Sequence, residues 1–372
     1  MIRVTSFHKS SKRLECSVCI NSHSPFQLYC ESDAEFSSHA NWTLCNLLLP
    51  AMSLGEDLHI EGPISPVLMH RLDIIQDIYL AWRPDYKRIR VTATETEEEP
   101  AGEGVGLFFS GGIDSLYSLV KHQDQITHLI LVHGFDVDIS DQNSFRACQD
   151  GAEKIADQLG KKLYVVRTNI REFSNQYCGW GIFHGGALAA VSSLLSSLLR
   201  KTIIGSSYTY GQLHPWGSHP LLDPLWSTGS LEIVHDGAES NRVQKTRKLG
   251  EHPWSLQYLR VCWEEASAYN CGKCEKCLRT MIGLSIAGKL ENCPVLPHQI
   301  DLKNVRHQEL TSGSAIFWEE FEGQIQQTDL AAAVRLAIKN YLRGIPPDLG
   351  TPYSKARRVK TTVKKIMKVM AG

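Results

Sequence analysis

The spacing of apolar residues changes character along the chain, and the change divides it into parts. Up to residue 93, stretches that alternate between apolar and polar positions are interleaved with stretches of helical period. This mixture predicts a small α/β domain over residues 1–93. Its expected strands are 13–20, 26–30 and 87–93, and its expected helices are 41–52 and 66–82.

Residues 94–104 interrupt the pattern. The stretch reads TETEEEPAGEG and contains no large apolar side chain, so it has little surface to bury in a core. Proline and glycine among acidic residues are typical of a linker. We predict a domain boundary over residues 94–104.

Beyond the linker, short continuous apolar runs alternate with longer helical patterns. Strands buried on both faces give such runs, which are typical of a parallel sheet covered by helices on both sides. We therefore expect a doubly wound α/β domain over residues 105–294, with ligands bound beyond the carboxyl ends of its strands. The expected strands are 105–110, 128–135, 162–169, 201–207 and 231–237, and the expected helices are 114–122, 141–160, 181–200 and 239–250.

The last part of the chain contains two segments that differ in pattern and composition. Residues 295–345 are mostly helical in pattern, most clearly over 328–341, whereas residues 346–372 form a strongly basic tail. A basic tail predicts RNA or an acidic protein as a partner, or a membrane surface. A solvated tail is the alternative.

Composition narrows the class of protein only a little. The chain has 372 residues, of which 42% are apolar and 21% charged, and its net charge of −1 gives no overall attraction to nucleic acid or membrane. No apolar run approaches the roughly 18 residues of a membrane span, and the first residues contain no apolar signal core. We expect a cytoplasmic protein without a transmembrane segment.

The turn after the first strand of the predicted sheet reads SGGIDS, residues 110–115. Gly111 and Gly112 can adopt positive φ and let backbone N–H groups crowd around an anion. Ser110 and Ser115 add hydroxyl donors, and the following helix directs its positive end at the same place. The turn is predicted to cradle phosphate, although it lacks both the Walker lysine and the G-x-G-x-x-G spacing. The alternative is a tight turn in which Asp114 only caps the helix.

Cysteine spacing supplies the second strong signal. Of eleven cysteines, Cys262, Cys271, Cys274 and Cys277 form the pattern C-x8-C-x2-C-x2-C. Such clustering in a reducing compartment indicates a metal site, and four thiolates complete the tetrahedral shell of structural Zn²⁺. An iron–sulfur cluster is the competing occupant.

The order of these two motifs resembles a known family. The turn SGGxDS is similar to the pyrophosphate loop of the N-type ATP pyrophosphatases, the adenine nucleotide alpha-hydrolase-like superfamily. Together with C-x8-C-x2-C-x2-C, it resembles 7-cyano-7-deazaguanine synthase over about residues 105–285. The resemblance implies that residues 110–115, Ile113 included, hold the pyrophosphate of ATP while a substrate carboxylate attacks the α-phosphorus. Ammonia or an amine would then displace AMP to give an amide or a nitrile.

The resemblance also implies roles for residues elsewhere in the predicted domain. Backbone groups of Val132 and Gly134 would contact the adenine, and Gly205 would complete the nucleotide site. Arg242 and Lys245 would lie against the triphosphate. The residues expected to carry the chemistry are Ser110, Asp114 and Lys245, with Asp114 also helping to organise Mg²⁺.

Other functions share the same loop. Sulfur transfer to a tRNA base would need a catalytic cysteine, for which Cys178, close to His184, is the candidate; core packing is the alternative role for both side chains. A protein that senses ATP without turnover is a further alternative. The predicted partners are a small-molecule or peptide carboxylate, an ammonia or amine donor and a second copy of the chain.

Overall fold

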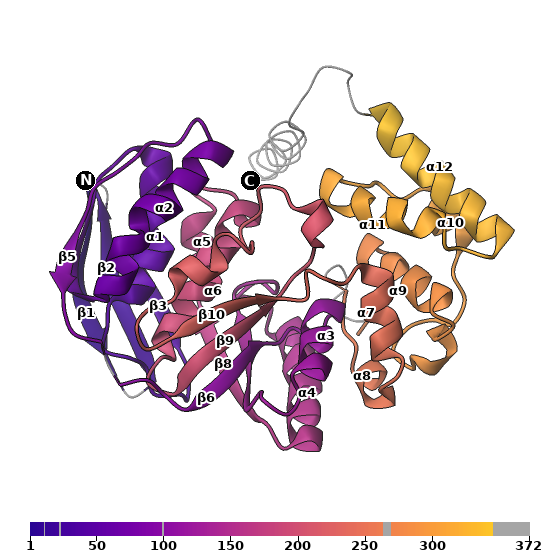
Figure 1. Ribbon diagram of the computed structural model, residues 1–372, viewed down its shortest axis with the longest axis horizontal. Helices are drawn as coiled ribbons and strands as arrows, with labels where there is room; N and C mark the ends of the chain where they lie inside the picture. Colours follow the sequence, from indigo (N-terminus) through magenta and orange to yellow (C-terminus); the bar gives the residue numbers. More distant parts are fainter. Residues whose placement is uncertain (11, 22–23, 99, 263–268, 345–372) are drawn as a thin grey trace, which may run out of the picture.

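The computed structural model is an α/β protein built on a ten-stranded, mostly parallel sheet (Figure 1). It describes residues 1–10, 12–21, 24–98, 100–262 and 269–344. Within these residues the strands lie side by side in the order β10-β9-β6-β7-β8-β3-β2-β1-β4-β5. The basic tail 346–372 lies outside the described residues, and so do the partners predicted for it.

The second half of the sheet follows the predicted pattern of strands and helices. From β6 the chain moves to β7 and β8 on one side, then returns to β9 and β10 on the other, and all five strands are parallel. The strands are β6 (Gly104–Phe108), β7 (His128–His133), β8 (Lys162–Thr168), β9 (Leu199–Gly205) and β10 (Glu232–Asp236). The helices between them are α3 (Ile113–Lys121), α4 (Gln142–Leu159), α5 (Ile170–Ser174) and α6 (Trp180–Leu194), and α7 (Arg242–Leu249) follows β10.

Both faces of this half of the sheet are buried, which explains why its strands read as continuous apolar runs. Leu107 of β6 packs in the cluster that contains residues of α3 and α4. Phe108, the next residue, points to the opposite cluster, which contains residues of α1 and α6. One boundary in the prediction was wrong: the helix expected over 181–200 ends at Leu194, because the chain turns there into β9.

The first 95 residues extend the same sheet. Strand β3 pairs antiparallel with β8 through Cys30 and Thr168, and the Thr168 hydroxyl donates to the carbonyl of Tyr29 at 2.6 Å. Strands β1 and β4 were not predicted, and the strand expected over 87–93 begins only at Val91. The elements are β1 (Ile2–Lys9), β2 (Arg13–Ile20), β3 (Phe26–Glu31), α1 (Asn41–Leu54), β4 (Leu58–Ile64), α2 (Pro66–Trp82) and β5 (Val91–Glu95).

The helices near the end of the described chain form a third apolar cluster against α7 and α9, seen on the right of Figure 1. Phe317, Trp318 and Val334 are buried there. None of the described helices has the length and apolarity needed to cross a membrane. The helices that follow α7 are α8 (Pro253–Gln257), α9 (Glu275–Ile286), α10 (Leu302–Arg306), α11 (Ser312–Glu322) and α12 (Thr328–Gly344). Of these, α8 packs instead in the cluster that contains residues of α3 and α4.

Candidate functional site

The turn between β6 and α3 leaves backbone donors open at the carboxyl edge of the sheet. Gly111 has a φ of +75°, which a side chain would strain, and Gly112 caps α3 with no side-chain hydrogen bond. The backbone N–H of Arg260 donates to the carbonyl of Gly111 at 2.9 Å and anchors the turn. Ser110 is exposed beside it. The uncapped end of a nine-residue helix is suited to bind an anion.

Two other predicted ligand residues serve the packing of this turn. A Cβ atom on Gly205 would lie 2.9 Å from the carbonyl oxygen of Asp114, so glycine lets β9 approach the first turn of α3. The hydroxyl of Ser115 is buried and donates to the carbonyl of Gly112 at 3.1 Å. In the structure both residues shape the turn.

A buried cluster of charges stands beside the turn. Arg242 Nη2 donates to Asp114 Oδ2 at 3.0 Å, and Lys245 Nζ donates to Asp114 Oδ1 at 2.9 Å. Lys245, which is 1% exposed, also donates to the carbonyl of Ser206. Burial would raise the pKa of the Asp114 carboxyl, but Arg242 and Lys245 outweigh it and the pKa falls to about 2. The structure thus brings together three residues that the sequence placed in the site.

A further cation reaches this cluster from α9. The guanidinium carbons of Arg242 and Arg279 lie 5.0 Å and 4.3 Å from the ring centroid of Phe317, on α11. Burial lowers the pKa of Arg279, whose Nε lies 3.4 Å from Glu275. The aromatic ring therefore holds two buried guanidinium groups close to Asp114.

Two buried arginine atoms near the turn have no hydrogen-bond partner within the part of the chain that the structure describes. They are the Nε atoms of Arg242 and Arg260. Buried donors are almost always satisfied, and a charged one left unpaired is costly. A bound anion such as a phosphate or carboxylate would supply the missing acceptors.

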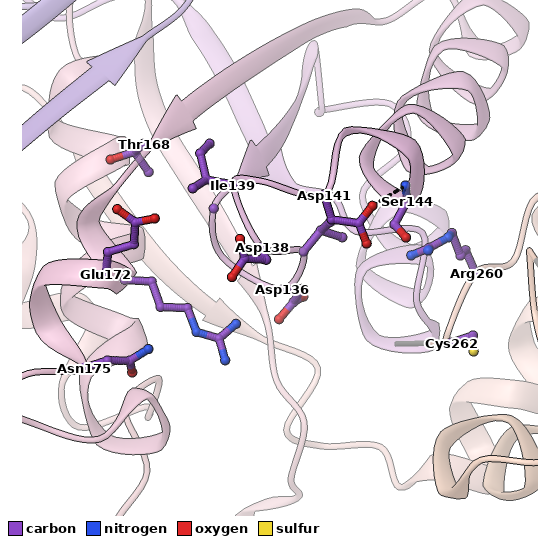
Figure 2. A pocket seen from close by; sticks show the side chains of 13 residues that line it. Asp136, Asp138, Ile139, Asp141, Ser144, Thr168, Glu172, Asn175, Arg260 and Cys262 are labelled. Atoms are coloured by element: carbon purple, nitrogen blue, oxygen red, sulfur yellow. Dashed lines mark hydrogen bonds between the residues drawn. The ribbon is translucent and has the colours of Figure 1, made fainter. Parts of the chain in front are cut away.

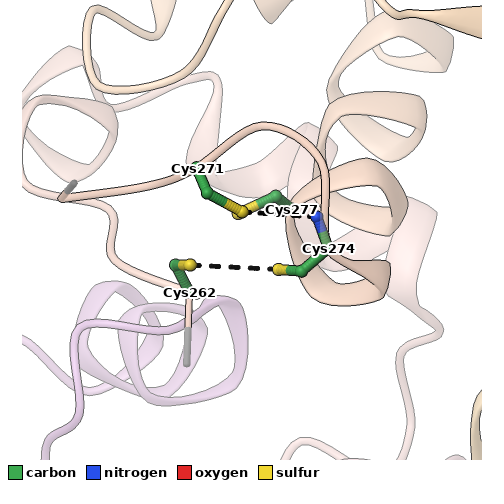
Figure 3. Close-up of side chains that lie close together, drawn as sticks. All are labelled: Cys262, Cys271, Cys274 and Cys277. Carbon is green, nitrogen blue, oxygen red and sulfur yellow. Dashed lines mark hydrogen bonds between the residues drawn. The ribbon is translucent and has the colours of Figure 1, made fainter. Parts of the chain in front are cut away.

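The four clustered cysteines converge at the start of α9 (Figure 3). Their sulfur atoms all lie within 4.8 Å of one another, and the Cys262–Cys274 and Cys271–Cys277 pairs are each 3.9 Å apart. Four sulfurs at about 2.3 Å from one zinc ion would lie about 3.8 Å apart. The predicted cluster is confirmed as a set that could hold a metal ion such as zinc.

Backbone groups around the cysteines support a metal site. The N–H groups of Lys273 and Cys274 point at the sulfur of Cys271, at 3.4 and 3.3 Å. Such N–H···S contacts orient thiolate ligands in metal sites. Interaction with Cys277 lowers the pKa of the Cys274 thiol to about 5 and raises the pKa of the Cys277 thiol, so without an ion the proton stays on Cys277.

A cavity of about 580 Å³ opens at the carboxyl ends of β7 and β8 (Figure 2). This volume lies within the range of small-molecule sites. Gly134 lines the cavity with a φ of +103°, and a Cβ atom there would lie 2.0 Å from the carbonyl of Thr168. Val132 is half-buried and packs against the apolar core instead. Arg260 and Cys262 form one wall, so the cavity adjoins both the glycine turn and the cysteine cluster.

The residues considered for sulfur transfer lie in a packed environment. Cys178 is 6% exposed, and burial raises the pKa of its thiol. The ring of His184 contacts the carbonyl of Trp180 and accepts from the backbone N–H of Ser218 at 3.2 Å. A protonated, buried thiol is a poor nucleophile.

Sequence reasoning missed Arg260, Arg279 and Phe317. Arg279 stands two residues after Cys277, so the cysteine pattern could have drawn attention to it. Arg260 stands two residues before Cys262, so the same pattern could have drawn attention to it as well. Phe317 carries no local signal, since only the fold brings it to the site.

The remaining evidence on function comes from comparison with known proteins. No protein-family model matches the chain, and no curated protein shows significant similarity to it.

Proposed function

We propose that the protein is an ATP-dependent carbon–nitrogen ligase that adenylates a carboxylate and transfers ammonia or an amine to it. One observation carries the proposal. An uncapped helix N-terminus after a glycine turn lies beside a buried cluster of cations. This combination would neutralise a polyphosphate in the way that phosphoryl and nucleotidyl transfer requires.

The chain's own residues would divide the work of holding ATP. Backbone groups of residues 110–115 and the exposed Ser110 hydroxyl would bind the β,γ-pyrophosphate. Arg242 and Lys245 would neutralise its charge, with Asp114 holding both cations in place before ATP arrives. Because both oxygens of Asp114 already accept from these cations, the carboxyl fits poorly as a direct Mg²⁺ ligand.

The proposed reaction has two steps. A carboxylate oxygen of the substrate attacks the α-phosphorus, the bond to the bridging oxygen breaks, and pyrophosphate leaves. The nitrogen of ammonia or an amine then attacks the activated carbonyl, AMP leaves, and the nitrogen loses a proton. Positioning and charge neutralisation account for most of the rate in such transfers, so no single side chain has to act as acid or base.

The topology of the sheet supports this location for the nucleotide. The order β8-β7-β6-β9-β10 is compatible with a doubly wound sheet in which the chain reverses direction between β6 and β9. Ligands of such sheets bind at the reversal, beyond the carboxyl ends of the strands. The glycine turn follows β6, the first strand at that point.

The cysteine cluster would have a structural role. All four ligand positions of a tetrahedral zinc ion would be filled by Cys262, Cys271, Cys274 and Cys277, which leaves no place for substrate. Bound zinc would supply folding free energy to this segment.

Analysis of the nucleotide products tests the proposal. The full chain would be incubated with ATP, Mg²⁺, ammonium and a small-molecule cell extract, with Ser110→Ala and the surface variant Asp157→Asn in parallel. We expect AMP and pyrophosphate from the wild type and from Asp157→Asn, and much less from Ser110→Ala. ADP and phosphate as the products would overturn the proposal. ATP binding without any turnover would indicate a sensing protein instead.

A further inference from the structure

The cavity at the ends of β7 and β8 has two chemically different sides. Arg260 lies on the side next to the glycine turn, to which its backbone is hydrogen bonded at 2.9 Å. Four carboxylates, together with Arg171, also line the cavity, on the segments that follow β7 and β8. The carboxylates are Asp136, Asp138, Asp141 and Glu172.

Arg260 is the buried donor of this cavity. It is 9% exposed, and its Nε has no hydrogen-bond partner among the described residues. In Figure 2 its side chain extends from the wall shared with Cys262 toward Asp141 and Ser144. A planar guanidinium suits a carboxylate, which accepts two parallel hydrogen bonds from it. The position of Arg260 would hold such a carboxylate close to the glycine turn.

The opposite side carries an excess of negative charge. Among the lining residues on this side, Asp136, Asp138 and Glu172 lie with one guanidinium group, that of Arg171, whereas Asp141 lies on the side of Arg260. Arg171 already donates to the carbonyl of Phe135 and lies 5.0 Å from the ring centroid of Trp180. Hydrogen bonds from Ser140 lower the pKa of Asp138, so this carboxyl is ionised at neutral pH. Carboxylates gathered around a concave space attract a cation to it.

We propose that this cavity binds the substrate of the ligase and that the substrate is a carboxylate that also bears an amine or guanidinium group. The inference rests on the proposed function. The carboxylate would meet Arg260 beside the α-phosphate, and the cationic end would meet the carboxylates after β7 and β8. Amino acids and guanidino acids belong to this class, whereas dicarboxylates and fatty acids do not.

The cysteine cluster gains a second role in this arrangement. Asn270 Oδ1 accepts from the backbone N–H groups of Val261 and Cys262, at 2.9 and 3.3 Å. Asn270 stands directly before the metal-binding Cys271, so the cluster and this amide together fix the segment that carries Arg260. The cluster is thus a positioning element for the substrate cavity.

Binding of four small carboxylates to the full chain, without nucleotide, tests the inference by calorimetry and saturation-transfer NMR. The probes are 6-aminohexanoate, 4-guanidinobutyrate, hexanoate and glutarate. We expect the two cationic probes to bind at least tenfold more tightly than hexanoate, and glutarate to bind weakest. Hexanoate or glutarate binding as tightly as the cationic probes would overturn the inference. Failure of all four to bind would overturn it as well.

Charge variants locate the two ends of the ligand. We expect Arg260→Gln to weaken the cationic probes about tenfold and Arg260→Lys to restore part of the loss. The double variant Asp136→Asn, Glu172→Gln should bring the cationic probes and hexanoate to similar affinity. Asp157→Asn, on the exposed side of α4, is the matched control. Unchanged affinities in both the Arg260 variants and the double variant would contradict the placement.

Product analysis separates this inference from the proposed function. If AMP forms from ATP with the cationic probes but not with hexanoate or glutarate, both the ligase function and the substrate class are supported. Selective binding of the cationic probes without AMP, under any nucleotide condition, would leave the cavity assignment standing and refute the ligase. AMP formed only with carboxylates that lack a positive charge would support the ligase and overturn the substrate class.

Discussion

Replacing Asp114 with asparagine isolates the buried charge cluster beside the glycine turn. The substitution keeps the size of the side chain but removes the negative charge that Arg242 and Lys245 share. Arg242 and Lys245 are 8% and 1% exposed, so water can compensate them only in part. We expect a large loss of stability for so small a change.

The size of the loss follows from the ionisation of Asp114. Folding lowers the pKa of this carboxyl from 3.8 to about 2, which corresponds to about 2 kcal/mol of stabilisation at 1.36 kcal/mol per pKa unit. This figure already contains the interaction with the two cations. Breaking fully buried pairs costs about 3 to 5 kcal/mol, and the Asp114 side chain is 20% exposed, which places the cost toward the lower end. We therefore expect Asp114→Asn to lower the free energy of unfolding by about 2 to 4 kcal/mol at neutral pH.

The pH dependence has a definite sign. Because the pKa of Asp114 is lower in the folded state, its contribution is complete above about pH 4 and is lost as the pH falls toward 2. The free energies of unfolding of the wild type and Asp114→Asn, measured with urea, should therefore differ by a constant amount between about pH 5 and pH 8. The difference should shrink only below about pH 4.

Anions and a surface control complete the assay. Inorganic pyrophosphate should stabilise Asp114→Asn more than the wild type, since it replaces the missing counter-charge. Asp157→Asn should change the free energy of unfolding by less than about 0.5 kcal/mol. If Asp114→Asn and Asp157→Asn have the same free energy of unfolding, Asp114 does not stabilise the fold by neutralising Arg242 and Lys245.

The other predictions concern single side chains around the site. Phe317→Leu should weaken ATP binding about fivefold in calorimetry, since Phe317 holds two arginines, and an unchanged Kd would contradict that role. Ser110→Ala should keep the urea midpoint but weaken pyrophosphate binding about tenfold, and a shifted midpoint would mean that the hydroxyl is structural. Elemental analysis should find zinc in the wild type, and Cys274→Ser should remove it and lower the urea midpoint. Iron with acid-labile sulfide in the wild type would indicate an iron–sulfur cluster instead. Cys178→Ala should leave AMP formation within about twofold of the wild type. Loss of AMP formation in this variant would instead favour the sulfur-transfer function.

Local patterns predicted most of the parallel half of the sheet. Its strands are buried on both faces, so each reads as an apolar run that ends near the observed residue. Strands β1 and β4 escaped prediction because their patterns are broken: Ser6 has a φ of +55° in β1, and β4 contains Gly62 and Pro63. The pairing of β3 with β8 joins residues about 140 apart, which no local pattern could indicate.

The candidate site divides in the same way. The glycine turn lies within residues 110–115 and the four cysteines lie within residues 262–277, so the spacing inside each short stretch was enough to predict both motifs. Phe317 reaches the site through contacts between distant segments, and the C-terminal helices were not expected to take part. Arg260 lies two residues before Cys262, but only the fold places it beside the glycine turn. The functions assigned to Val132 and Gly205 stay predictions, since the structure gives both residues packing roles.

Exchange of labelled pyrophosphate into ATP shows whether the protein cleaves ATP at the α-phosphorus to adenylate a carboxylate. The assay would use the full chain with Mg²⁺, unlabelled ATP, ³²P-labelled pyrophosphate and a carboxylate pool, without any amine donor. Cleavage at the α-phosphorus predicts that label enters ATP only when a carboxylate substrate is present, and that Ser110→Ala slows the exchange. Absence of exchange under conditions in which the protein releases ADP or phosphate from ATP would contradict the account.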